Sequence, residues 1–367
     1  MKLAKTALVL ALATAGTMAA AESQVTLYGT IDGAVVVNKA KGGDATVSLD
    51  DGIAGGSVWG LEGSEELGNG YSVGFLLENG FTMDNGAAGE DGKAFSKQAT
   101  LSLSGNFGEL AFGRMGGLAS YEGSYSIWDA SPLGTAYLQG GLGNTFVTGQ
   151  INNNSIVYVS PEFGGLKIHA QYSNGVEEDT QKWSRNSHYY GLGATYEIGN
   201  LSLAGIVERF DNKGAENKDK DKATMVYSLS AAYDFEVAKA FFGYQYASRF
   251  HGFDQLEDVT VAGKGMNQNA FTLGAEVPAA GGTFKVAANY GFGKVKSADG
   301  VVVGDEKLSN DKFNRFTVGA AYEYPLSKRT FVYGWGAYAT AGKMLKEKAV
   351  EENFKSWSLG LGLHHAF

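Results

Sequence analysis

Large apolar residues alternate with small or polar residues along most of this chain. The clearest case is the C-terminal segment, where Trp357, Leu359, Leu361 and Leu363 alternate with serine, glycine and histidine up to the final residue, Phe367. A period of two places successive side chains on opposite faces of a β-strand. The same pattern predicts sixteen strands, at residues 24–38, 57–66, 71–81, 96–105, 109–115, 154–161, 166–174, 188–198, 200–211, 224–235, 238–250, 268–277, 283–293, 313–324, 329–341 and 355–367.

The connections between these segments alternate between short and long. Short ones such as 68–70 and 106–108 contain glycine and asparagine, whereas long ones such as 39–56, 116–153 and 212–223 are more polar. Tilted strands of about ten residues cross a bilayer, and bacterial barrels carry tight periplasmic turns and long outer loops. The pattern therefore predicts an all-β fold, a sixteen-stranded antiparallel transmembrane β-barrel with short periplasmic turns and long extracellular loops.

A soluble β-protein with one solvated face would show the same alternation. It would have no reason to gather its long loops at one end of the sheet. It would also rarely leave a terminal strand bare, apolar on one face and aromatic at its tip. These two features favour the membrane barrel.

The first residues have the pattern of a secretory signal. Lys2 and Lys5 precede the short apolar run Ala7 to Ala15, and a run of alanines ends at Ala21. This order of basic, apolar and small residues is typical of a cleaved leader. We therefore predict a signal peptide at 1–21 and a barrel domain at 22–367.

Charge and cysteine content exclude several function classes. The formal net charge is −9, and removal of the two leader lysines lowers it to −11. Such an acidic chain argues against a nucleic-acid partner, which needs clustered Lys and Arg. The absence of cysteine excludes thiolate metal sites and cysteine nucleophiles.

Several segments resemble the betaproteobacterial, Neisseria-like trimeric general porins of the Gram-negative outer membrane. The similar segments are Gln24 to Asp32, Gly60 to Gly70, Gly108 to Arg114, Asn154 to Phe163 and Gly362 to Phe367, in the expected order. The resemblance implies a homotrimer and passive diffusion of small hydrophilic solutes and ions. It also implies a multi-pass outer-membrane location, among outer-membrane lipid and lipopolysaccharide. In this family the terminal aromatic residue, here Phe367, is the signal that the barrel-assembly machinery recognises.

The longest loop, 116–153, is the predicted constriction. A sixteen-stranded lumen is a wide aqueous channel, and a long third loop folded inward would narrow it. The loop is only lightly charged, and we place its acids Glu122 and Asp129 at the constriction.

A ladder of basic side chains faces such acids in the resembled family. Arg114 stands at an expected ladder position, but Val58 and Glu62 replace ladder residues. Alternation also places several charged side chains toward the lumen, namely Lys167, His169, Arg249, Lys285, Arg315, Asp32, Glu78 and Glu208. Because charge at a constriction sets ion preference, the thinned ladder predicts weak selectivity or a lean toward cations.

Other functions remain as alternatives. A substrate-specific porin for sugars or organic acids would need an aromatic track, to which Tyr121, Tyr125, Trp128 and Tyr137 could contribute. An outer-membrane enzyme or an adhesin barrel is an alternative of another class. The histidines lack metal-ligand spacing and no nucleophile motif is visible, so we predict no cofactor and no enzymatic activity.

Overall fold

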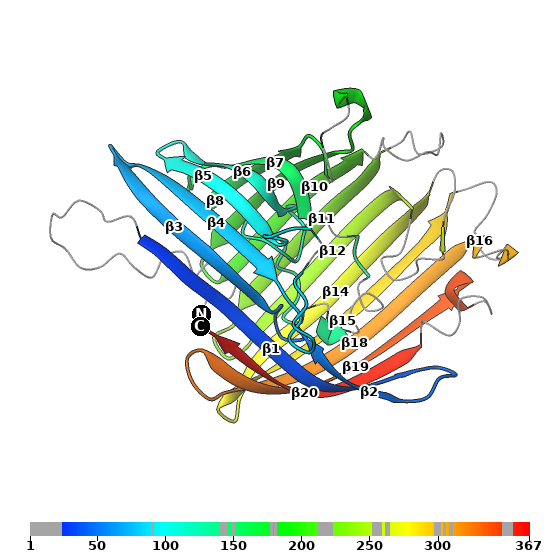
Figure 1. Cartoon of the computed structure of the whole chain (residues 1–367). Coiled ribbons are helices and arrows are strands. Elements are labelled where there is room, and N and C mark those ends of the chain that lie inside the picture. Colours follow the sequence, from blue (N-terminus) through cyan, green and yellow to red (C-terminus); the bar gives the residue numbers. More distant parts are fainter. Residues whose placement is uncertain are drawn as a thin grey trace.

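Sixteen tilted antiparallel strands close into a barrel (Figure 1). The computed structural model describes residues 24–89, 92–134, 136–138, 145–147, 151–176, 179, 182–211, 223–251, 259–260, 265–296, 302–303, 306–307, 311–346 and 355–367, and the predicted signal peptide lies outside them. The strands of the barrel are β1 (Gln24–Ala40), β3 (Val58–Gly68), β4 (Tyr71–Gly80), β5 (Gln98–Gly105), β6 (Gly108–Gly116), β7 (Ile151–Val159), β8 (Leu166–Ser173), β9 (His188–Ile198), β10 (Leu201–Asp211), β11 (Thr224–Asp234), β12 (Lys239–Phe250), β14 (Met266–Ala279), β15 (Gly282–Val295), β18 (Lys312–Pro325), β19 (Thr330–Lys343) and β20 (Ser356–Ala366). The predicted fold class is confirmed, with strand ends a few residues from the predicted ones.

The connections keep the predicted alternation of length. At one end β14 and β15 are joined by the two-residue turn Ala280–Gly281, in which both residues have a positive φ of 49° and 83°. Such a turn matches the twist of a hairpin. The long connections lie at the other end, which a porin-type barrel turns outward.

Short strands also form within loops that the sequence pattern left without structure. β2 (Thr46–Asp51) pairs with the second half of β1, and β13 (Val259–Thr260), β16 (Val302–Val303) and β17 (Glu306–Lys307) form a separate small sheet. The first long loop thus begins as an extension of the wall. Its later residues, 52–57, turn back toward β1.

Closure of the barrel joins β20 to β1. The register runs from Thr30 opposite Ala366 to Ala40 opposite Ser356, while residues 24–30 of β1 pair with β3. β1 therefore meets β3 along its first half and β20 along its second half. The offset is the stagger that closing a tilted sheet requires.

The two faces of the strands divide as the alternation predicts. On β20, Leu359, Leu361 and Leu363 are 54%, 73% and 49% exposed on the outer face. Inward-facing Ala247 and Thr317 are fully buried. In the part of the chain that the structure describes, no helix is long and apolar enough to cross a membrane.

Candidate functional site

The long connection between β6 and β7, residues 117–150, enters the barrel, and we call it the third loop. Leu118, Trp128 and Phe146 of this loop pack with Ile206 of β10 and Ala270 of β14. Farther along, the loop packs on a second part of the wall through Leu133, Tyr137 and Leu138, against Ala287, Ala321, Trp335 and Ala337. Two buried clusters of the described residues therefore lie between the loop and one side of the barrel. We call this side, the inner face of β9–β19, the covered wall.

Glycines on the covered wall make room for the loop. A Cβ atom on Gly193 would lie 2.6 Å from Ile127 Cδ1, and one on Gly243 would lie 2.6 Å from Ala130 Cβ. The same close approach occurs at Gly274 with Pro132 and at Gly319 with Leu138, and Leu118 would lie 3.1 Å from a Cβ atom on Gly191. Because any larger residue would collide with the loop, these positions shape a recess that sets its path.

Polar groups of the covered wall tether the backbone of the loop. Tyr189 Oη accepts a hydrogen bond from Leu118 N at 2.8 Å and donates one to Glu208 Oε1 at 2.7 Å. Glu208 Oε1 also accepts from Ala119 N at 3.2 Å. Buried backbone groups need such partners, since an unpaired one is costly.

Two glutamines repeat this arrangement at the other end of the loop. Gln245 of β12 accepts from Val147 N at 2.7 Å and donates to Val147 O at 2.9 Å. Gln268 of β14 donates to Thr145 O at 2.6 Å. Hydrogen bonds therefore fix the loop to the wall at Leu118 and Ala119 and again at Thr145 and Val147.

Tyrosines of the loop donate to carboxylates of the strands. Tyr125 Oη donates to Glu109 Oε1 of β6 at 2.6 Å, and Tyr137 Oη donates to Glu323 Oε1 of β18 at 3.1 Å. Burial, together with the neighbouring carboxylate, raises the pKa of both phenols well above the ordinary value. Both hydroxyls therefore stay protonated and act as donors over the physiological pH range.

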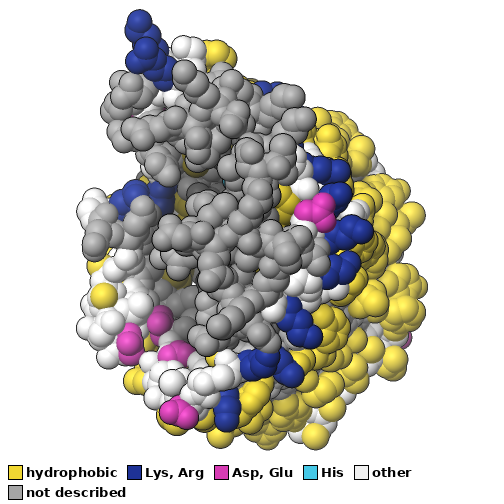
Figure 2. Space-filling view, turned by 90° about the vertical axis from the view of Figure 1, so that its right-hand side faces the viewer, with side chains coloured by type: hydrophobic (Ala, Val, Ile, Leu, Met, Phe, Trp, Pro, Cys, Tyr) yellow, Lys and Arg dark blue, Asp and Glu magenta, His cyan; other side chains and the backbone are white. Residues whose placement is uncertain are grey.

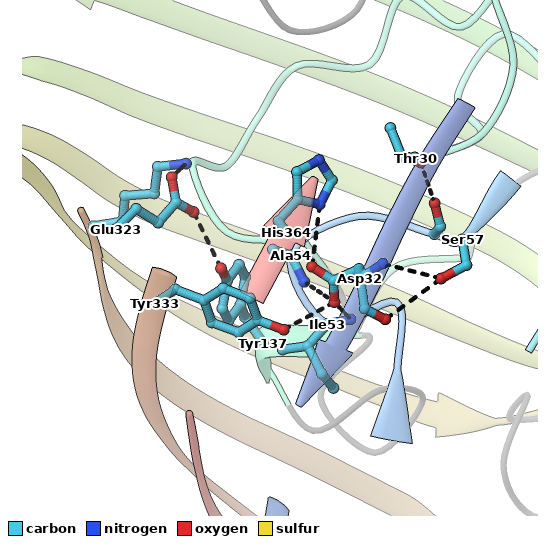
Figure 3. A network of polar contacts seen from close by, with 11 residues as sticks. Thr30, Asp32, Ile53, Ala54, Ser57, Tyr137, Glu323, Tyr333 and His364 are labelled. Carbon is cyan, nitrogen blue, oxygen red and sulfur yellow. Dashed lines mark hydrogen bonds and ion pairs between the residues drawn. The ribbon is translucent and has the colours of Figure 1, made fainter. Parts of the chain in front are cut away.

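A second network forms where the barrel closes, around Asp32 of β1 (Figure 3). Asp32 Oδ1 accepts from Ile53 N and from Tyr333 Oη, both at 2.8 Å, and Oδ2 lies 3.1 Å from His364 Nδ1. Asp32 is fully buried, and the ring of Tyr137 lies 5.6 Å from that of Tyr333. The network joins β1, β19, β20, the last residues of the first long loop and the middle of the third loop.

The predicted loop acids both lie beside lysines. Glu122 Oε1 is 2.9 Å from Lys97 Nζ, and Asp129 Oδ2 is 3.8 Å from Lys239 Nζ. Lys239 lies directly opposite Glu276 in the sheet. The lumen-facing lysines of this region are thus close to acids, as is Lys285, which lies 2.8 Å from Glu323.

Glu62 and Lys167 lie in different parts of the lumen. Glu62 is a half-buried, inward-facing residue of β3. Its partner in the pairing with β4 is Leu76, two residues before Glu78. Lys167 lies near the short turn between β7 and β8, with Nζ 3.8 Å from Glu162 Oε2. Lys167 is therefore at the periplasmic rim, away from the third loop.

The three predicted arginines do not form one ladder. Arg114 lies at a register shift between β6 and β7, after Gly113 with a φ of 133°, and its half-buried side chain donates to Ser96 O and Asn153 Oδ1. Arg315 is 5% exposed and donates to Gln268 Oε1 at 3.2 Å, and the same glutamine donates to Thr145 O of the third loop.

Arg249 departs from the lumen position that alternation gave it. A register shift between Ser248 and Phe250 and a φ of 59° at Arg249 interrupt the alternation at the extracellular end of β12. Its Nε donates to Ala223 O at 3.0 Å. A bulge of this kind changes the direction of a side chain without changing the apolar pattern.

The opposite side of the lumen carries acids without ion pairs. We call the inner face of β3 and β4 the open wall, because the contacts of the third loop within the described residues fall on β5, β6 and β9–β19. Tyr28 Oη donates to Glu78 Oε2 at 2.8 Å, and neither Glu62 nor Glu78 has an ion pair among the described residues. Carboxylates that border a partly filled channel attract cations.

The sequence pattern placed Asp32 and Glu208 toward the lumen without predicting their hydrogen-bonding roles. It gave no indication of the role of Tyr189 or of the glycine recess. The only available signal was an acid at an inward position of a strand. Across the described part of the chain, no three His, Asp or Glu side chains are arranged to hold a metal ion.

Known proteins resemble this chain along its whole length. A family model described as Gram-negative porin matches residues 6–343. An outer membrane porin protein of Bordetella pertussis is 31% identical, covering 95% of this chain and 96% of its own length. The major outer membrane protein P.IB of Neisseria meningitidis is 29% identical over 98% of both chains.

A solved structure gives the same result. The anion-selective porin from Comamonas acidovorans has a TM-score of 0.66 and 28% identity, covering 94% of this chain and all of its own. The sequence matches, the closed barrel and the loop within its lumen agree with one another. The chain is therefore an outer-membrane channel protein, not an enzyme, and belongs to the Gram-negative porin family.

Proposed function

We propose that this porin is a general diffusion channel for small hydrophilic solutes and ions, with weak selectivity or a preference for cations. The observation that carries the proposal is the distribution of charge in the lumen. Lys97, Lys239 and Lys285 lie within 4 Å of acids, whereas Glu62 and Glu78 border the open wall without an ion pair among the described residues.

This distribution favours cations for an electrostatic reason. A lysine paired with a carboxylate contributes little net field along the channel axis, while an uncompensated carboxylate in a narrow channel does. The related Comamonas acidovorans structure is named as an anion-selective porin, which makes selectivity the decisive property to measure.

The test is the zero-current potential of the refolded porin in a planar bilayer under a salt gradient. A small potential, or one with the sign of cation preference, supports the proposal. A strong anion preference would overturn it.

A substrate-specific channel finds little support in the aromatic residues of the third loop. Trp128 and Tyr137 are 2% and 3% exposed because they pack against the covered wall. A track that guides sugars needs ring faces open to the lumen. Conductance that a solute blocks in a saturable manner would favour the substrate-specific alternative.

The functional unit is a homotrimer in this proposal. The outer face around the closure carries large aliphatic residues, with Val25, Leu27 and Val35 of β1 exposed by 54% to 61% beside Leu361 of β20. Contact with another apolar surface, lipid or protein, buries such a face. Conductance that increases in groups of three equal steps would support a trimer, whereas single steps would contradict it.

A further inference from the structure

The chain folds back into the extracellular mouth of the barrel directly after β19. Figure 2 looks onto this end, where Lys and Arg side chains gather along the boundary between the hydrophobic outer wall and the mouth. Just after this strand, the short helix η5 (Met344–Lys346) nevertheless begins with two apolar side chains, Met344 and Leu345, which are both buried. We call the segment 343–346 the strap.

A residue in the left-handed backbone conformation turns the strap inward. Lys343, the last residue of β19, lies opposite Phe313 in the pairing with β18 and has a φ of 61°. A residue that carries a side chain adopts this conformation at an energetic cost and keeps it only where surrounding contacts compensate. The contacts of the next two residues provide that compensation.

The strap packs on the inner face of the covered wall, at its extracellular end. Met344 and Leu345 belong to one buried apolar cluster with residues from β11, β12, β14, β15 and β18. These residues are Val226, Ala247, Phe250, Met266, Val295 and Phe313. Because removal of apolar surface from water is the main stabilising contribution to such a cluster, the strap is held in the mouth by hydrophobic contact.

The same cluster contacts the third loop. Val147, in the returning half of that loop, packs against the cluster that contains the strap. Val147 also belongs to the second of the two places at which hydrogen bonds fix the loop to the wall, since its backbone N and O bond to Gln245. The strap therefore shares one apolar cluster with this second anchor of the loop.

Neutral amides form the hydrogen bonds of the second anchor. Gln245 bonds to Val147 at 2.7 and 2.9 Å, and Gln268 donates to Thr145 O at 2.6 Å. A hydrogen bond between neutral groups contributes little net stability, because the same groups bond to water when they are exposed. The apolar contact with the strap cluster therefore adds to the strength of this anchor.

We propose that Met344 and Leu345 are positioning residues of the channel: they hold the returning end of the third loop against the covered wall and thereby set the size limit for solutes. Without these contacts, the returning end of the loop would move toward the open wall, because a sixteen-stranded barrel leaves room on that side. The proposal rests on the diffusion channel proposed above, but it concerns the size of solutes and not their charge.

The test uses two matched pairs of variants of the full chain. Met344→Asn places a polar group in the cluster, whereas its control Met225→Asn makes the same change on the outer face of β11, which Met225 shares with the exposed Tyr227. In the second pair, Lys343→Val disfavours the inward turn, because a β-branched residue rarely adopts a positive φ, and Lys343→Gly retains the turn.

The first measurement is the swelling of porin-containing liposomes in neutral sugars. We expect Met344→Asn and Lys343→Val to lower the rate for a disaccharide relative to a pentose by roughly threefold, since a displaced loop narrows the channel. Met225→Asn and Lys343→Gly should keep the ratio of the parent. A merely structural role of the strap would lower both sugar rates alike and leave their ratio unchanged.

The second measurement follows the anchor itself. The chain contains no cysteine, so Val147→Cys introduces a single thiol at the second anchor. We expect a water-soluble thiol reagent to label this cysteine severalfold faster when Met344→Asn is also present, because the loop end leaves its apolar cover.

An unchanged sugar ratio or unchanged labelling would overturn the proposal, and so would a higher relative rate for the disaccharide. Should Met344→Asn fail to insert, the two Lys343 variants carry the same comparison. Parent liposomes that take up neither sugar would reject the diffusion channel itself. Uptake by the parent without an effect of the strap variants would reject only the role of the strap.

Discussion

The covered wall and the open wall of the lumen use the same strand alternation for different purposes. On the covered wall, inward positions carry glycines that admit the third loop and lysines that lie beside acids. On the open wall, inward positions carry Glu62 and Glu78 without an ion pair among the described residues. One side of the barrel is thus a packing surface, while the other is available to solutes.

The recess matters because it decides which wall stays open. A loop of this length could lie on any part of a wide lumen. Because Gly193, Gly243 and Gly319 have no side chain, the third loop can approach this side of the barrel without steric overlap. Tyr189 and Glu208 supply hydrogen bonds to the loop on the same side. The position of the channel therefore follows from the wall as much as from the loop.

The largest expected effect comes from filling the recess. In Gly243→Val, the added side chain would overlap Ala130 and Thr272, and overpacking of this kind typically costs about 1–3 kcal/mol. Because both sides of the loop remain tethered, the segment is pushed toward the open wall. We expect single-channel conductance to fall by about half. A sixteen-stranded barrel is wide enough that the displaced loop narrows the channel without closing it.

The control for this change is Gly74→Val on β4 of the open wall. A Cβ atom there would meet Ser102 Oγ at 3.0 Å and no atom of the third loop. Its conductance should stay close to that of the parent. Equal losses in both variants would contradict the division between the two walls.

Neutralising the open wall should change selectivity next most strongly. In Glu62→Gln with Glu78→Gln, the lumen loses two carboxylates without ion pairs among the described residues, so the preference for cations over anions should fall by roughly twofold. The zero-current potential in a salt gradient measures this change.

A paired charge on the covered wall provides the comparison. Lys285→Met with Glu323→Gln removes two opposite charges 2.8 Å apart and leaves the net charge unchanged. We expect the zero-current potential to stay as in the parent. A larger shift here than on the open wall would mean that paired residues control selectivity.

Stability should respond to the network that closes the barrel. Asp32→Leu would remove the acceptor for Ile53 N, Tyr333 Oη and His364 Nδ1, and each buried partner left unpaired costs about 1–3 kcal/mol. We expect a lower thermal unfolding temperature in detergent. Asp44→Leu in the exposed first loop is the control. An equal drop in the unfolding temperature of that variant would contradict a special contribution of Asp32 to stability.

A smaller loss of stability should follow from Tyr189→Phe. The change removes the acceptor of Leu118 N and the donor to Glu208, a loss of about 1–3 kcal/mol for the unpaired groups. More frequent brief closures in single-channel records should accompany it, since the loop loses a tether. Tyr190→Phe on the outer face should leave the records unchanged.

Removal of Phe367 should have the smallest effect on the channel itself. Phe367 exchanges backbone hydrogen bonds with Gly29 at 3.0 and 3.2 Å, and neither bond involves a lumen-facing side chain. We expect less protein in the outer membrane, measured by fractionation, and unchanged conductance of the channels that assemble. Altered selectivity after this deletion would connect the terminus to the lumen.

The strands and their faces could be predicted from the sequence because each face of a barrel strand meets its own environment. Lipid on one side and a polar or loop-filled lumen on the other impose a period of two, so the segment from Trp357 to Phe367 already indicated strand, outer face and membrane. The family followed from short segments such as Gly108 to Arg114. Both kinds of evidence are local in the chain.

The tertiary structure alone decided where the third loop lies and which charges meet. Tyr137 and Glu323 are 186 residues apart, so no local pattern could join them. A bulge at Arg249 changed its direction while the apolar pattern stayed the same. Hydropathy thus determined which residues face the lumen, but packing and hydrogen bonds across the barrel determined which of them border the channel.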